Sequence, residues 1–536
     1  MKKLLVANRG EIAVRIFRTC KRLGIATVAV APPGDRAALH ARSADEVVEI
    51  TGYLDIEEHI RAAQETGADA IHPGYGFLAE SPTFAEAVEA AEIGFVGPTP
   101  DALRIGGDKL AAKEIAHRAG ISIVPAGDAG EIGFPLVVKA AAGGGGRGMR
   151  VVRHPEDLTD AVDAARREAA AAFGDDRVFC ERFVDRPRHV EVQLLGDGVG
   201  GVVALGERDC SIQRRHQKVL EESPAPGLDD DLRAAISEAA VAFARAVGYR
   251  SAGTAEFMLN GRDFWFLELN GRIQVEHPVT ELVTGLDLVE QQLRIADGGA
   301  LPPSWSSADG HAIEARLYAE DSRTFLPQTG RITRLRLGTG VRVDAGVEEG
   351  DEVGVAYDPL LAKIIAFEET REDALRRLAS ALRETEVEGL TTNLLFLRWL
   401  VDHPLVREGR ATTAFLVDHP PLSAIQSRIA SRSWHGSWRL NLASPPPAAP
   451  PDIELASHIA GAGVEESVLR AQMPGTVISV LVADGDKVGA REPLLVLEAM
   501  KMETPVVSPY DATVRRVHVA EGDRIAAGAV LVELEE

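Results

Sequence analysis

The segment FLELNGRIQVEH, residues 266–277, places a charged or amide side chain at every second position. These side chains belong to Glu268, Asn270, Arg272, Gln274 and Glu276. Because residues two apart on a β-strand share a face, the spacing predicts a strand with one polar face. An ordinary amphipathic strand would also alternate. However, it rarely collects carboxylates, amides and an arginine on one side without a ligand.

A carboxylate in a second strand-like run extends this set. Glu256 lies in TAEFML, residues 254–259. Oxygen ligands from Glu256, Glu268 and Asn270 suit Mg²⁺ held together with the phosphates of ATP. A structural ion-pair network would explain Glu256 or Arg272 singly but not the whole set.

A glycine-rich segment, KAAAGGGGRGMRVV, follows the strand that ends at Lys139. Glycines let backbone N–H groups approach phosphate oxygens, and a nearby lysine adds positive charge. The segment does not match the GxxxxGK[ST] phosphate-binding loop. A glycine run alone also fits a flexible hairpin. The phosphate-binding interpretation is favoured here because the acidic residues described above occur in the same chain.

A third chemical feature is EAMKM, residues 498–502, in which Lys501 stands between two methionines. Most lysines are simply solvated, but folding alone does not require paired methionines on an exposed turn. The segments 475–498 and 512–535 align without a gap at an offset of 37 residues. Each half predicts a strand, a turn and a second strand. Two such halves predict a small barrel with an approximate dyad and with Lys501 on the turn between them.

The elements that position these groups fall into three parts. KLLVA, the helical pattern EIAVRIFRTCKRLG and IATVAV predict a parallel α/β unit over roughly the first hundred residues. Four later apolar runs, RHVEVQLLG, GVVALGE, TAEFML and FWFLELN, predict an antiparallel sheet. ASPPPAAPPD, residues 443–452, predicts an extended spacer before the barrel.

The composition of the chain excludes several classes of protein. The 536-residue chain is 45% hydrophobic and carries a formal net charge of −23, which argues against nucleic acid as a partner. Three scattered cysteines do not predict a disulfide framework or a zinc site. No apolar run is long enough for a membrane span. We therefore expect a cytoplasmic protein.

Together these segments resemble the biotin carboxylase family of ATP-grasp enzymes over about residues 1–420. The motifs that carry the resemblance are VANRGEIAVRI (6–16), IHPGYGFLAE (71–80), GDK (107–109), KAAAGGGGRGMRVV (139–152), RHVEVQ (188–193), ERDCSIQRRHQKV (207–219), ELNGRIQVEHPVTE (268–281) and TNLLFL (392–397). The AMKM motif between two repeat halves resembles the biotinyl domain of biotin-dependent carboxylases. Lipoyl domains share the barrel but usually lack the paired methionines, so lipoate is the second hypothesis for Lys501.

The resemblance implies an α/β body followed by a small all-β biotinyl (lipoyl-like) barrel. The implied segments are an N-terminal domain (1–106), an ATP-grasp domain (107–305), a C-terminal mixed domain (306–425), a linker (426–465) and a carrier domain (466–536). The family usually has a helix before the GFP strand, and residues 120–139 leave no room for it. This departure concerns how the lid docks and removes no matched catalytic residue.

The resemblance also implies a role for each matched residue. Groups expected to contact ATP are Lys109, Lys139, Gly145, Gly146, the hinge residues Glu181, Arg182, Phe183 and Val184, and His189, Gln213 and His216. Arg182 replaces the usual hinge lysine. Glu256, Glu268 and Asn270 are expected to hold Mg²⁺ or Mn²⁺. Bicarbonate is expected at Lys218, Arg272, Gln274 and Val275, with Glu276 as general base. Arg342 is expected to stabilise the biotin enolate, and Lys501 to carry biotin.

The implied reaction joins ATP, bicarbonate and biotinyl-Lys501 to give ADP, phosphate and carboxybiotin. The resemblance implies a homo-oligomer, a biotin protein ligase that modifies Lys501, and a separate carboxyltransferase subunit that passes the carboxyl group to acetyl- or propionyl-CoA. A pyruvate-specific partner is the nearest alternative. From a different class, the alternative is a carrier or scaffold with an inactive ATP-grasp body, and the complete metal and bicarbonate set argues against it.

Overall fold

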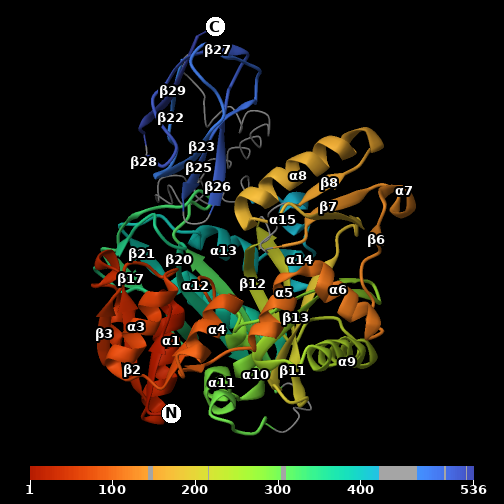
Figure 1. Cartoon of the computed structure of the whole chain (residues 1–536), viewed down its shortest axis with the longest axis vertical. Helices are drawn as coiled ribbons and strands as arrows, with labels where there is room; N and C mark the ends of the chain where they lie inside the picture. Colours follow the sequence, from red (N-terminus) through yellow and green to blue (C-terminus); the bar gives the residue numbers. More distant parts are fainter. Residues whose placement is uncertain are drawn as a thin grey trace, which may run out of the picture.

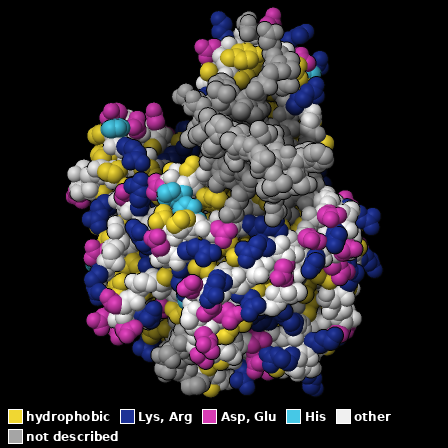
Figure 2. Space-filling model, turned by 180° about the vertical axis from the view of Figure 1, so that it is seen from behind, with side chains coloured by type: hydrophobic (Ala, Val, Ile, Leu, Met, Phe, Trp, Pro, Cys, Tyr) yellow, Lys and Arg dark blue, Asp and Glu magenta, His cyan; other side chains and the backbone are white. Residues whose placement is uncertain are grey.

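The computed structural model describes residues 1–142, 149–214, 217–302, 309–421, 467–499, 502–526 and 528–535. Within these ranges no helix combines the length and the apolar character that a membrane crossing requires. The carboxyl-terminal barrel stands on one side of a larger body, and a lid projects from the same body (Figure 1). Side chains of both charges are interspersed over the face of the body shown in Figure 2.

The N-terminal unit is a parallel sheet with strand order β3-β2-β1-β4-β5. Leu4 and Val6 of β1 join one apolar cluster and Leu5 joins another, so both faces are covered, as expected for a parallel sheet. The strands are β1 (Lys3–Val6), β2 (Ala26–Ala31), β3 (Glu46–Glu49), β4 (Ala70–His72) and β5 (Gly94–Phe95). The helices are α1 (Gly10–Leu23), α2 (Leu39–Ser43), α3 (Ile56–Thr66), α4 (Pro82–Ala90) and the short 3₁₀ helix η1 (Pro33–Asp35).

The centre of the body is an eight-stranded antiparallel sheet with order β14-β13-β10-β11-β12-β15-β20-β18. Its strands are β10 (Arg188–Asp197), β11 (Val202–Arg214), β12 (Gln217–Ser223), β13 (Arg250–Asn260), β14 (Asp263–Asn270), β15 (His311–Tyr318), β18 (Arg342–Ala345) and β20 (Leu360–Glu368). The helices that pack on it include α5 (Pro100–Gly107), α9 (Asp230–Ala246), α10 (His277–Thr284) and α11 (Leu288–Ala296). The sheet therefore runs across both sides of the expected boundary at 305/306.

The strand predicted through residues 266–276 ends earlier than expected. Strand β14 stops at Asn270, and helix α10 starts at His277. The residues between them, 271–276, form a loop with a turn at 275–276. The prediction that all five polar residues share one strand face was therefore wrong beyond Asn270, because the segment turns into the helix instead of extending the sheet edge.

The lid is a four-stranded sheet with order β6-β9-β7-β8. Its elements are β6 (Ala126–Gly127), α7 (Ala129–Ile132), β7 (Leu136–Ala140), β8 (Arg150–Val152), η2 (Pro155–Asp157), α8 (Leu158–Phe173) and β9 (Val178–Arg182). Helix α6 (Lys109–Arg118) precedes the lid in the chain and packs on β14 of the central sheet. Leu136 and Val138 of β7 pack with Val152 and Ala165 on the α8 side. A single helical turn, α7, lies in the shortened segment 120–139.

The rest of the body packs helices on the β15–β20 end of the large sheet around a core that includes Leu378, Phe396 and Leu400. The helices are α12 (Arg371–Glu384), α13 (Leu394–Val401), α14 (Pro404–Arg407) and α15 (Phe415–Asp418). Two small antiparallel pairs, β16–β19 and β17–β21, complete this part. They are β16 (Gly330–Arg331), β17 (Arg334–Arg336), β19 (Glu352–Val353) and β21 (Glu386–Glu388).

The barrel consists of two four-stranded sheets, β22-β29-β27-β24 and β26-β25-β23-β28. Its strands are β22 (Val468–Arg470), β23 (Gly475–Val480), β24 (Lys487–Val488), β25 (Pro493–Ala499), β26 (Met502–Val507), β27 (Ala512–Val517), β28 (Arg524–Ile525) and β29 (Val530–Glu535). Each repeat half contributes its short strand, β24 or β28, to the sheet of the other half. Leu326, from a loop of the body, packs against the barrel core.

Candidate active site

Lys218 of β12 lies at the centre of a buried charge cluster. Its Nζ donates hydrogen bonds to Glu191, to Oε1 of Glu256 at 2.8 Å and to Oε1 of Glu276 at 2.6 Å. The three carboxylates come from β10, β13 and the residue before α10, so three separate elements converge on one ammonium group. Arg208, fully buried on β11, pairs with the other oxygen of Glu191 at 2.6 Å.

Glu276 is held between two cations. Lys218 binds one carboxylate oxygen, and Nη2 of Arg316 lies 2.9 Å from the other. Burial alone would raise the pKa of Glu276, but these two cations hold that pKa well below the usual range. Glu276 is therefore ionised at neutral pH and able to accept a proton.

The predicted metal ligands are neighbours across two strands. Glu256 of β13 stands directly opposite Glu268 of β14 in the strand register. Asn270 donates from Nδ2 to Oε1 of Glu256 at 2.9 Å. Burial and the nearby charge of Glu256 raise the pKa of Glu268. Two adjacent carboxylates and an amide form an oxygen-rich set that fits Mg²⁺, whose charge would offset their mutual repulsion.

His189 and Gln213 line the same side of the cluster. His189 Nε2 lies 2.9 Å from Glu256 Oε2, and its Nδ1 lies 3.0 Å from the Gln213 amide. Burial alone would lower the pKa of His189, but Glu256 raises it. The structure thus brings both predicted residues to Glu256, one of the predicted metal ligands.

Arg272 and Gln274 reach the cluster from the loop after β14. Arg272 donates to Gln274 Oε1 at 2.9 Å and to Asn270 Oδ1 at 3.2 Å, and its Nε lies 3.0 Å from Glu80 Oε2. Gln274 is 3% exposed and contacts Glu256 Oε1 at 3.5 Å. The loop therefore gathers the residues that a single strand face was expected to gather.

A second charge cluster joins the lid to α6. Glu181 is fully buried on β9, with Oε2 2.6 Å from Lys139 Nζ and Oε1 paired with Lys113. Burial would raise the pKa of Glu181, but Lys139 and Lys113 lower it. Lys109 begins α6, whose amino end is capped by Asp108.

The hinge residues follow directly after Glu181. Arg182 lies over the ring of Trp265, 5.7 Å from its centroid. The Phe183 amide donates to the Pro135 carbonyl at 3.2 Å, and Val184 continues the segment out of the lid. The substitution of Arg182 for the usual lysine thus places a guanidinium against an aromatic ring of β14.

Arg342 of β18 lies in a neighbouring set of ion pairs. Its Nη1 is 2.8 Å from Glu281 Oε2, and its Nη2 is 2.7 Å from Asp344 Oδ2. Burial lowers the pKa of Arg342, but Glu281 and Asp344 outweigh this and raise it. Arg342 is 20% exposed in its side chain, so part of the guanidinium is open to solvent.

Four predicted site residues, Gly145, Gly146, His216 and Lys501, lie outside the described residues, as does the linker 426–465. Sequence reasoning also missed several buried partners of the site. These are Lys113, Glu191, Arg208 and Arg316. Charged residues inside otherwise apolar strands, as in RHVEVQ and HAIEARLY, were the signal that could have identified two of them, Glu191 and Arg316.

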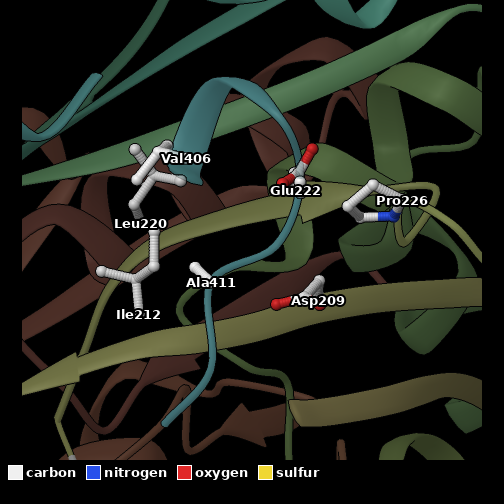
Figure 3. Close-up of a pocket in the computed structure, with 8 residues that line it drawn as sticks. Asp209, Ile212, Leu220, Glu222, Pro226, Val406 and Ala411 are labelled. Atoms are coloured by element: carbon white, nitrogen blue, oxygen red, sulfur yellow. The ribbon is translucent and has the colours of Figure 1, made fainter. Parts of the chain in front are cut away.

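A small cavity lies apart from these clusters, between β11, β12 and segment 406–411 (Figure 3). It is lined by Asp209, Ile212, Leu220, Glu222, Pro226, Val406, Gly409 and Ala411. Its volume of about 10 Å³ is roughly that needed for one water molecule. It is therefore too small for a nucleotide.

Four family models match successive parts of the chain. They are "Biotin carboxylase, N-terminal domain" over residues 1–103, "Carbamoyl-phosphate synthase L chain, ATP binding domain" over 108–304, "Biotin carboxylase C-terminal domain" over 314–418 and "Biotin-requiring enzyme" over 467–534. The matches follow one another in the order of the parallel unit, the lid with its sheet, the helical end of the body and the barrel.

Individual relatives agree with these matches. The alpha subunit of mitochondrial methylcrotonoyl-CoA carboxylase from Oryza sativa subsp. japonica is 48% identical over 78% of this chain, which spans 60% of that protein. The mitochondrial propionyl-CoA carboxylase alpha chain from Homo sapiens is 36% identical, with 99% of this chain and 91% of that protein covered. The structure of a biotin carboxylase–β,γ-ATP complex from Campylobacter jejuni is 42% identical over 78% of this chain and 99% of that chain, with a TM-score of 0.76.

Proposed function

The chain belongs to the biotin-dependent carboxylase family, and we propose that it carboxylates biotin on its own carrier barrel, using ATP and bicarbonate. The observation that carries the proposal is the convergence of Glu191, Glu256 and Glu276 on Lys218. This cluster puts a base (Glu276), a cation (Lys218) and a metal-ligand candidate (Glu256) within one buried site. The barrel supplies the second half of the proposal, because its repeat halves flank Lys501.

Bicarbonate binds beside Lys218, Arg272, Gln274 and the Val275 backbone. Glu276 is the general base that removes the bicarbonate proton. Its low pKa makes it a weak base while Lys218 and Arg316 both pair with it. A bicarbonate anion that takes over one hydrogen bond of Lys218 raises the pKa of Glu276 and strengthens it as a base at the moment of reaction.

ATP lies between the lid and the central sheet. Lys109, Lys139 and the loop with Gly145 and Gly146 contact its phosphates, where cations offset negative charge. Glu181, Arg182, Phe183 and Val184 form the adenine hinge, and His189, Gln213 and His216 line the pocket. Glu256, Glu268 and Asn270 hold Mg²⁺ or Mn²⁺, which supplies charge neutralisation at the transferred phosphate.

Arg342 acts on the carrier side of the site. Biotin, when joined to Lys501, supplies the ureido nitrogen that accepts the carboxyl group. Arg342 keeps its positive charge and would supply it beside the ureido ring when biotin is bound. Its pairs with Glu281 and Asp344 fix the direction of the guanidinium.

A partner subunit completes the overall reaction. Relatives of this chain are named as alpha subunits or chains of acyl-CoA carboxylases, which supports a separate carboxyltransferase subunit here. The acceptor is an acyl-CoA of the acetyl or propionyl type. A biotin protein ligase modifies Lys501, and the chain works as a cytoplasmic homo-oligomer.

Bicarbonate-dependent ATP hydrolysis tests the proposal directly. The purified chain, with Mg²⁺ and free biotin, should release ADP only when bicarbonate is added, and the carboxylated biotin should be recoverable at alkaline pH. An intact-mass measurement after co-expression with a biotin ligase should show a biotinyl adduct on Lys501. No bicarbonate dependence in a folded, metal-loaded protein would reject the carboxylase proposal.

A further inference from the structure

Lys363 of β20 is a lysine with no exposed surface. Its Nζ lies 3.0 Å from Glu11 Oε1 and 4.0 Å from Asp344 Oδ2. It also donates a hydrogen bond to the backbone carbonyl oxygen of Val275 at 2.9 Å. An ammonium group is costly to bury unless it is paired and hydrogen-bonded, so this arrangement needs a reason.

The pairing with acids accounts for the charge but not for the third contact. Glu11 and Asp344 are both buried, each 3% exposed, and together they offset the charge of the lysine. The contact with Val275 reaches a different element, the turn before α10. Lys363 therefore connects the C-terminal part of the body to the loop that carries Gln274 and Glu276.

The neighbouring carbonyls show what the Val275 contact adds. The Gln274 carbonyl accepts hydrogen bonds from the amide and from Nδ1 of His277, at 3.3 and 2.7 Å. The Glu276 carbonyl accepts one from the Val279 amide at 3.3 Å. These donors belong to α10 itself. The donor to Val275 comes instead from a strand 88 residues away in sequence, and it fixes the turn relative to the sheet.

The same lysine lies beside the ion pairs of Arg342. Asp344 is shared between Arg342, at 2.7 Å, and Lys363, at 4.0 Å. Tyr75 donates its hydroxyl to the Glu11 carboxylate that Lys363 also contacts. Lys363 thus joins the turn at Val275 and Glu276 to the residue proposed to face the ureido ring.

We propose that Lys363 is a positioning residue that holds the Val275–Glu276 turn in the geometry that binds and deprotonates bicarbonate. The inference rests on the proposed function. Without the Nζ donor, the Val275 carbonyl loses its partner and the turn can rotate, which moves the base and the adjacent backbone away from bicarbonate. The nucleotide contacts of the lid do not depend on this turn.

The test compares three variants of the full-length chain. In Lys363→Met the buried Glu11 carboxylate loses its cation, whereas Asp344 keeps Arg342, so this variant reports mainly on folding. In Glu11→Gln/Lys363→Met one buried negative charge is removed with the positive one, while the donor to Val275 is still absent. Glu11→Gln alone is the matched control, because it keeps the lysine and its hydrogen bond to Val275.

For the double variant we expect the KM for bicarbonate in bicarbonate-dependent ATP hydrolysis to rise about tenfold, the scale of one lost hydrogen bond at a reacting site. The KM for ATP should stay within about twofold. Glu11→Gln should keep a bicarbonate KM near that of the wild type. A merely structural role would lower the amount of active enzyme without changing the ratio of the two KM values.

A folded double variant with the wild-type bicarbonate KM would overturn the inference. If the double variant does not fold, Glu11→Gln/Lys363→Leu replaces it, since leucine also carries no donor for the Val275 carbonyl, and the same rise is expected. A wild-type chain without bicarbonate-dependent hydrolysis would instead reject the proposed function, so the two failures are distinguishable.

Discussion

The body and the barrel bury different kinds of side chain. The body encloses charged residues with no exposed surface, among them Arg208, Lys363 and Glu191. Within the part of the barrel that the structure describes, Ser508 is the one buried polar side chain. Its core consists of residues such as Val477, Leu494 and Leu531.

This difference in buried side chains fits a different task for each unit. Buried ion pairs bring little net stability, because desolvation offsets much of the attraction between the charges. They do fix the positions of groups that must act on charged substrates. An apolar core stabilises a small domain without assigning it any chemistry, so the barrel suits a carrier whose working group lies at its surface.

Replacing Lys501 should have the largest effect. Lys501→Arg keeps the charge but offers no primary amine for an amide with biotin, so overall acyl-CoA carboxylation with the partner subunit should be lost completely. Carboxylation of free biotin should continue, since the body is unchanged. Intact mass and the two assays measure this. A lipoyl mass on the wild type, or a biotinyl adduct that survives the substitution, would contradict it.

Removing the base should have the next largest effect. Glu276→Gln should lower bicarbonate-dependent ATP hydrolysis by roughly 10²–10⁴-fold and leave ATP binding largely intact. A coupled ADP assay and a nucleotide titration separate the two. Glu348→Gln is the matched control, because Glu348 is 56% exposed in its side chain. Near-wild-type turnover of Glu276→Gln would exclude its role as base.

Substitutions that create a cavity in one of the two cores should lower the stability of that unit alone. Leu494 of the barrel and Leu378 of the body are both fully buried. Each change to alanine should cost about 2–5 kcal/mol of the free energy of unfolding of its own unit. By calorimetry, Leu494→Ala should lower the transition of the barrel and Leu378→Ala that of the body. Equal shifts of both transitions in either variant would show that the units unfold together.

The smallest effect concerns pH and the stability of the body. Burial would raise the pKa values of Glu181 and Glu222, but their cationic partners lower them. The stability that these pairs contribute is present above the ordinary pKa of about 4.5 and is lost as the pH falls below it. The Tm of the body should therefore fall below about pH 4.5, whereas the described barrel buries no carboxylate that would act in this way.

A raised pKa works in the opposite direction at higher pH. Burial raises the pKa of Glu221 to about 7. Ionised Glu221 destabilises the body above that pH, and protonation relieves the cost as the pH falls toward about 4.5. The Tm of the body should thus rise modestly from about pH 8 to about pH 5 before it falls. Glu221→Gln should remove the Glu221 part of this rise, and an unchanged profile would contradict it.

Many residues of the candidate site could be predicted to lie together because they belong to compact motifs. Glu256, Glu268 and Asn270 fall on two consecutive strands, so a short-range pattern was enough to bring them together. The pattern misled beyond Asn270, since period-two spacing in the sequence also continues through a loop. Arg272, Gln274 and Glu276 are therefore brought to the site by a loop, which the alternating pattern did not predict.

The partners that sequence reasoning missed come from distant strands. Arg316 is 40 residues from Glu276, and Lys363 is 88 residues from Val275. Which charged residue meets which depends on strand order and register in the eight-stranded sheet, and a single sequence does not state either. The internal repeat, in contrast, predicted both halves of the barrel because each half repeats the same local pattern.

The exchange of short strands between the barrel halves has a consequence for how such a domain can arise. Neither half is complete alone, because the sheet of each half is finished by β24 or β28 from the other. A peptide of one half would leave a strand edge and an apolar face open to solvent. Two copies of that peptide would close both by the same exchange, so a chain of half this length could form the barrel as a pair. Sedimentation of the isolated 467–499 segment at increasing concentration would show whether it still associates in this way.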